Sequence, residues 1–167
     1  MDTILVAIVV MVLIIMSGLI ITVSIFQSAN NLADSWKDME AQSDSIKETA
    51  ISAVGNYSGG LIDIEVGNEG STNLYDYNNW DIIIQYQSGS ASHLSYTGTY
   101  PPASGGWAIE DIFMTGGATE VFDPDILNPE EVMALSANPE PEIGIGETVR
   151  VVVSTPNGVT SQCFVTR

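Results

Sequence analysis

The pattern of apolar and polar positions changes along the chain, from an unbroken apolar run to a seven-residue period and then to alternation. Residues 4–26 read ILVAIVVMVLIIMSGLIITVSIF, which is 23 residues without a charged side chain. A helix of this length extends about 34 Å, enough to cross a lipid bilayer. Because it is apolar on every side, it has to be enclosed by lipid or by other helices.

An apolar stripe with heptad spacing continues beyond bilayer length. Apolar or small residues recur every three or four positions, at Ile25, Ala29, Leu32, Trp36, Met39, Ser43, Ile46 and Ala50. Such a stripe packs against another helix or against the protein's own second domain. No proline or glycine interrupts residues 19–54, so the pattern predicts one helix over residues 1–54, ended by Gly55 as its C′ residue.

Beyond Gly55 the period becomes two and turn residues multiply, which is typical of short β-strands. The predicted strands are 61–66, 80–86, 93–97, 107–114, 119–122, 131–137, 148–154 and 159–166. The seventh and eighth are joined by Pro156-Asn157-Gly158, a strong hairpin signal. Residues 131–137 are ambiguous, because Asn128 with Glu131 three residues later also resembles a helix start. The pattern predicts an antiparallel β-sandwich over residues 55–167.

Charge narrows the choice of partners. The 167 residues include 21 acidic and four basic side chains, a formal net charge of −17. From Gly55 onward there are 15 acidic and two basic residues. A chain this acidic repels nucleic acid and anionic lipid headgroups, so neither is an expected partner.

Few residues offer catalytic chemistry. The single cysteine, Cys163, excludes an internal disulfide and alternates with its neighbours as a buried strand residue does. The single histidine, His93, lies between Ser92 and Ser95 without the spacing of a hydrolase motif. We therefore expect no enzyme activity and no cofactor.

The apolar run has three interpretations. A secretory signal peptide has a shorter apolar region behind a positive segment, yet no Lys or Arg precedes Lys37. A single-pass anchor normally has cationic flanks, which are also missing. A third hypothesis is that a basic leader has been removed and that Met1 is the first residue of the processed protein.

Several segments together resemble a known family. They are the charge-free helix, VGNEGSTNLYDYNNWDIIIQY at 66–86, LNPEE at 127–131 and VVVSTPNGV at 151–159. The chain is similar to the archaellins and their relatives, the subunits and accessory proteins of the archaeal-type flagellum. Two positions depart from the usual patterns. Leu5 stands where type IV pilins usually carry an acidic residue, and Glu130 stands where the family usually has glycine in Asn-Pro-Gly-Glu.

The resemblance implies a fold and a structural role. The fold is of the α+β class, a long N-terminal hydrophobic α-helix (1–54, the filament core) followed by an immunoglobulin-like antiparallel β-sandwich (55–167, the outer domain). The implied role is that of a non-enzymatic subunit of an extracellular filament for motility. Its implied partners are copies of itself, a prepilin-type peptidase that removes the leader, an assembly platform and, before assembly, the membrane. The alternatives are a membrane-anchored accessory sandwich that binds a cell-envelope partner, and an adhesive pilin.

The candidate site residues fall into three groups. The predicted polymerisation helix presents Ile4, Leu5, Ile8, Val12, Ile15, Leu19, Val23, Phe26, Leu32, Trp36, Met39 and Ile46. Asn56, in the sequon Asn56-Tyr57-Ser58, is a candidate for N-glycosylation. Asp123 and Asp125 are weak candidates for a hard cation, but a solvated acidic loop explains them better, so no metal is predicted.

Alternation places Trp80 with Ile82 and Ile84, so we expect the aromatic residues Trp80, Trp107, Tyr75, Tyr77, Tyr86, Tyr96 and Tyr100 to be in the core rather than in a binding surface.

Overall fold

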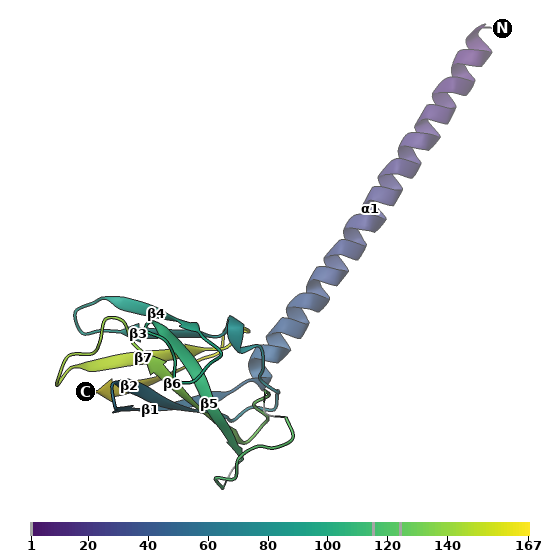
Figure 1. The fold of residues 1–167 in the computed structure, drawn as a ribbon. Coiled ribbons are helices and arrows are strands. Elements are labelled where there is room, and N and C mark those ends of the chain that lie inside the picture. Colours follow the sequence, from purple (N-terminus) through teal and green to yellow (C-terminus); the bar gives the residue numbers. More distant parts are fainter. Residues whose placement is uncertain (1, 115, 124) are drawn as a thin grey trace. The chain divides into compact units, whose positions relative to one another are not determined.

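The computed structural model describes residues 2–114, 116–123 and 125–167, which form two compact units. The first unit is Met1–Ser43 and the second is Asp44–Arg167. The helix α1 (Asp2–Glu48) makes up the described part of the first unit and supplies its last turn to the second. Figure 1 shows α1 and the strands of the second unit.

The hydroxyl side chains within the apolar part of α1 are turned back to the helix's own backbone. Ser17, Thr22 and Ser24 each donate a hydrogen bond to the carbonyl oxygen four residues earlier, at 2.8–2.9 Å. Each hydroxyl proton is thereby satisfied without water, which is a requirement for a helix enclosed by lipid or by other helices.

The predicted end of the helix at Val54–Gly55 is wrong. The helix ends at Glu48, and residues 51–58 form the edge strand β1 (Ile51–Ser58), which pairs along its whole length with β2 (Leu61–Asn68). The turn between them is Gly59-Gly60, and both glycines have positive φ, the geometry of a two-residue hairpin. That dipeptide, flanked by two β-rich segments, was the sequence signal for β1.

Gly55 has a packing role instead of a capping role. A Cβ atom added there would lie 2.7 Å from Val165 Cγ2 and 2.8 Å from Cys163 Sγ. Because both of those side chains belong to β8 (Thr160–Thr166), Gly55 is the point where β1 approaches the strand at the other end of the sheet order.

The second unit is the predicted β-sandwich. The remaining elements are η1 (Tyr77–Asn79), β3 (Asp81–Gln85), β4 (Ala91–Tyr96), β5 (Gly106–Met114), β6 (Glu131–Asn138) and β7 (Thr148–Ser154). The strand order is β1-β2-β6-β5-β4-β3-β7-β8. Antiparallel pairs make the first sheet (β1, β2, β6, β5) and the second sheet (β4, β3, β7, β8), and a short parallel pairing between β4 and β5 links them (Figure 1).

Seven of the predicted strands are confirmed, and that at 119–122 is wrong. Thr119 makes only an isolated bridge to Phe113. The carboxylate of Glu120 then accepts hydrogen bonds from the amides of Phe122 (2.6 Å) and Asp123 (3.2 Å), which are consequently not available for a strand pairing. The ambiguous segment 131–137 is a strand, β6, paired with β2 on one side and β5 on the other.

The core lies between the two sheets and contains the inward-facing residues of both. Trp80, Ile82 and Ile84 are buried as the alternation predicted, and so is Trp107. Cys163 is buried, and burial raises the pKa of its thiol, which confirms a structural cysteine. The aromatic prediction was only partly right, since Tyr75 and Tyr100 are exposed.

Candidate assembly surfaces

The helix α1 presents a continuous apolar surface along its length. All twelve residues predicted for polymerisation are exposed, from 68% for Ile4 to 42% for Ile46. The described part of the chain contains one helix long and apolar enough to cross a membrane, and it is this one. A side chain such as leucine contributes about 1.5–3 kcal/mol when it is fully buried, so covering this surface releases a large free energy.

The half of α1 beyond bilayer length is also apolar along one stripe. Leu32, Trp36 and Met39 are 54–66% exposed. These positions follow the heptad spacing, and the charged residues of this segment lie between them. The ion pair between Lys47 Nζ and Asp44 Oδ1, at 3.3 Å, joins two side chains that are largely exposed, so it stabilises the helix little.

The last turn of α1 is tied to the β7–β8 turn inside the second unit. The side-chain amide of Asn157 donates to Thr49 Oγ1 at 2.7 Å and to the carbonyl and hydroxyl oxygens of Ser45 at 3.3 and 3.2 Å. Thr155 Oγ1 donates to Asn157 Oδ1 at 2.6 Å and so holds the amide in this orientation. The Thr-Pro-Asn-Gly segment was recognised as a hairpin; its contact with the helix was not predicted.

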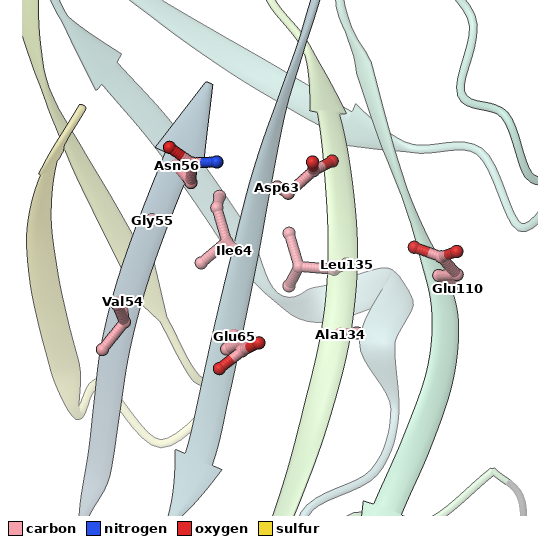
Figure 2. A pocket seen from close by; sticks show the side chains of 9 residues that line it. All are labelled: Val54, Gly55, Asn56, Asp63, Ile64, Glu65, Glu110, Ala134 and Leu135. Carbon is pink, nitrogen blue, oxygen red and sulfur yellow. The ribbon is translucent and has the colours of Figure 1, made fainter. Parts of the chain in front are cut away.

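The outer surface of the first sheet is hollowed (Figure 2). The hollow has a volume of about 360 Å³. Its lining includes Val54, Asn56, Asp63, Glu65, Glu110 and Ala134. Glu110 lies at the irregularity in the β5–β6 register between Ile109 and Asp111, and Figure 2 shows its carboxylate beside β6. The local sequence pattern does not reveal this surface, because it depends on the pairing of β2 with β6 and of β6 with β5.

Asn56 lies on β1, is exposed and pairs in register with Asp63. Its side chain is part of the hollow's lining. Asn56 is a candidate for N-glycosylation by its sequon and its exposure, and a glycan there would fill the hollow.

The weak cation site is not assembled by the described residues. No group of three or more His, Cys, Asp and Glu side chains there could hold a metal ion. Asp123 and Asp125 are exposed, and Pro124 lies outside the described residues.

A pair of carboxyl groups that no sequence motif marks lies between the β5–β6 loop and the start of β6. Glu120 and Glu131 are buried and hydrogen-bonded to each other. Burial raises the pKa of Glu131, while the backbone amides of Phe122 and Asp123 lower the pKa of Glu120. As the pH rises, Glu131 is therefore the member of the pair that loses its proton last, and it also accepts a hydrogen bond from the amide of Asn128 at 2.7 Å.

His93 and Asp81 meet on the outer surface of the second sheet. The His93 Nε2 atom lies 2.8 Å from Asp81 Oδ1, and both side chains are more than half exposed. The two residues come together through the β3–β4 pairing, which a motif search along the chain does not detect.

No protein-family model matches the chain, and no curated protein matches its sequence. Solved structures do match its fold. The periplasmic archaellum stator protein FlaG from Sulfolobus acidocaldarius aligns with a TM-score of 0.51 at 17% identity, over 70% of this chain and 98% of that one. Archaeal flagellin FlaB1 from Methanocaldococcus jannaschii aligns with a TM-score of 0.50 at 12% identity, over 70% of this chain and 88% of that one.

A third match is a chain of the FlaF–FlaG stator complex from Sulfolobus acidocaldarius. It aligns with a TM-score of 0.50 at 15% identity, over 68% of this chain and 86% of that one. The fold is that of archaellum proteins. The expected α+β fold is therefore confirmed, and the similar structures include both a flagellin and stator proteins.

Proposed function

We propose that the chain is a structural subunit of an extracellular archaellum-type filament and that it polymerises through α1. The observation that carries the proposal is the apolar stripe at Leu32, Trp36 and Met39, which continues after the 23-residue charge-free run has ended. A membrane anchor requires only the run. A packed bundle of helices requires the stripe as well.

In this proposal α1 is inserted in the membrane first and then enters the filament, where copies of α1 enclose one another. The β-sandwich forms the outer shell, and the carboxylates face solvent. The polymerisation surface then consists of the apolar run at residues 4–26 and the stripe that continues to Ile46. A prepilin-type peptidase and an assembly platform are the partners that this route requires.

The second candidate is an anchored accessory protein that binds a cell-envelope partner through its β-sandwich. The alignment with FlaG, over 98% of that chain, favours it. Both candidates use the same fold, and they differ in whether α1 leaves the membrane.

Electron microscopy of material sheared from cells that express the chain, with mass spectrometry of its content, separates the two. The filament proposal predicts uniform filaments composed of this chain. If the chain is found only in the membrane fraction and no filament contains it, the anchored accessory protein is the better account.

A further inference from the structure

The two sheets of the β-sandwich differ in charge. The strands of the first sheet contain Asp63, Glu65, Glu110, Asp111 and Glu131 and no lysine or arginine. The strands of the second sheet contain one acidic residue, Asp81, and also Arg150 and His93. The Asp81 carboxylate contacts His93, whereas the Arg150 guanidinium contacts no carboxylate among the described residues, so Arg150 is an unpaired cation on the second sheet.

The hollow on the first sheet is open and electronegative. The carboxylates of Glu65 and Glu110 make no hydrogen bond or ion pair within the described part of the chain, whereas the Asp63 carboxylate accepts a hydrogen bond from Ser136 Oγ at 3.1 Å. Beside these carboxylates, Val54 is 66% exposed and adds an apolar rim. The site therefore suits a group that combines an apolar body with a cation.

The second sheet carries such a group on its outer surface. Phe164 on β8 is 66% exposed and is the cross-strand partner of Arg150 on β7. The Arg150 guanidinium donates to Gln85 Oε1 at 3.3 Å and has no carboxylate partner among the residues that the structure describes. The Phe164 ring and the Arg150 guanidinium are thus adjacent on the outer surface of the second sheet, and both are exposed to solvent.

Electrostatics decides which surfaces meet. Two first sheets placed face to face would bring unpaired carboxylates together, and like charges at an interface cost several kcal/mol. A first sheet against a second sheet pairs Arg150 with Glu65 or Glu110 and covers Phe164 with Val54. Such a contact uses different surfaces on its two sides, and a contact of this kind that does not close generates a filament.

We propose that the Phe164–Arg150 pair of one copy seats in the hollow formed by Val54, Asn56, Asp63, Glu65, Glu110 and Ala134 of the next copy. The inference rests on the proposed filament function and supplies the contact between outer domains. The contact also excludes a glycan on Asn56, because the glycan would occupy the hollow.

A photo-crosslinking experiment tests the contact in the full-length chain on cells. A benzophenone amino acid replaces Phe164, and mass spectrometry identifies the crosslinked peptides. The proposal predicts a dimer joined to a peptide that contains residues 54–65 or Glu110 of a second copy. The same photoreactive residue at Tyr75, which is exposed but lies outside both sheets, is the matched control and should give no such product.

Charge reversal tests the electrostatic part. Arg150→Glu should lower the filament yield about tenfold or more, since a tenfold change corresponds to only about 1.4 kcal/mol per contact. Combining it with Glu65→Arg should restore the yield, because each contact then regains an opposite pair. Glu69→Arg, which changes an exposed carboxylate just outside β2, controls for net charge and should not rescue Arg150→Glu.

The outcomes separate this inference from the proposed function. If wild-type filaments form but the Phe164 crosslink maps elsewhere, or if Glu65→Arg fails to rescue Arg150→Glu, the contact is wrong and the filament function stands. If the predicted crosslink forms in membranes of cells that have no filaments, the contact is supported and the filament function is wrong. Finding a glycan on the Asn56 peptide of assembled material, or a crosslink to a different protein, overturns the contact.

Discussion

Glu130 has a backbone conformation that glycine adopts far more easily. Its φ is +68°, in the left-handed region, where a Cβ atom crowds the backbone. Its amide donates to the Asn68 carbonyl at 2.8 Å, so this turn directs the chain into β6. In the archaellins, which the sequence resembles, glycine usually occupies the position of Glu130.

We predict that Glu130→Gly stabilises the β-sandwich by about 1 kcal/mol, because it removes the left-handed strain. Chemical denaturation of the full-length protein in detergent, followed by tryptophan fluorescence, measures the change. Glu130→Ala is the control, since alanine keeps the strain. Equal effects of the two substitutions would show that the carboxylate, and not the backbone, matters here.

The Glu120–Glu131 pair makes stability depend on pH in a defined direction. The raised pKa of Glu131 contributes stability below the ordinary glutamate pKa, which is lost as pH rises through the folded-state value. The lowered pKa of Glu120 contributes above the ordinary value and is lost as pH falls. The pair therefore contributes most to stability near the ordinary glutamate pKa, where both contributions are present.

We predict that Glu131→Gln stabilises the protein more at pH 7.5 than at pH 5. An amide at this position accepts from the Asn128 amide and donates to Glu120 without needing a proton. Thermal unfolding at the two pH values gives the difference, with Glu69→Gln as an exposed control. A gain that is the same at both pH values would mean that the pair does not share a proton.

At the scale of elements, α1 carries two surfaces that different functions would use. The charge-free run suffices to hold the chain in a membrane, and the filament proposal additionally requires the stripe at Leu32, Trp36 and Met39 for packing between helices. A substitution in the stripe therefore distinguishes the filament from the anchor.

Met39→Asp should abolish filaments and leave the chain in the membrane, because it puts a charge into the predicted helix packing and leaves residues 4–26 unchanged. Gln42→Asp adds the same charge outside the stripe and should leave filaments intact. Negative-stain microscopy and membrane fractionation give both readouts. Normal filaments from Met39→Asp would contradict the role of the stripe.

The β7–β8 turn provides a second test at this scale. Asn157→Ala removes the hydrogen bonds to Ser45 and Thr49, and we expect it to destabilise the second unit by about 1–3 kcal/mol. Urea denaturation measures the loss. Asn157→Asp keeps the acceptor for Thr155 but lacks the donor, so it should be destabilised similarly. A stable Asp variant would show that the donor bonds contribute little.

At the scale of the whole molecule, the net charge of −17 opposes assembly. The repulsion acts between all neighbouring copies and is screened over about 8 Å at physiological salt. The same screening weakens the attraction between Arg150 and a carboxylate. That attraction involves only one cation per copy, so the loss is smaller than the repulsion that salt removes. We therefore predict that filaments become more stable as ionic strength rises. Light scattering of purified filaments during a NaCl titration measures this, and disassembly on adding salt would contradict it.

The sequence by itself determined the long apolar helix, the β-sandwich and most of the strands, because these follow from local periodicity. A charge-free run has few ways to be buried, and alternation such as that of Val149, Val151 and Val153 places one face inward whatever the topology. The burial of Cys163 and Trp80 followed from the same local pattern.

Only the tertiary structure decided the end of α1, the hollow and the pairing of distant groups. Residues 51–54 are compatible with a helix until β2 is available as a partner, so strand pairing overrode the local signal. Arg150 and Phe164 are brought together by the register of β7 and β8, and Glu120 reaches Glu131 from the loop between β5 and β6. Register is a property of two segments at once, and so neither segment's own pattern reveals it.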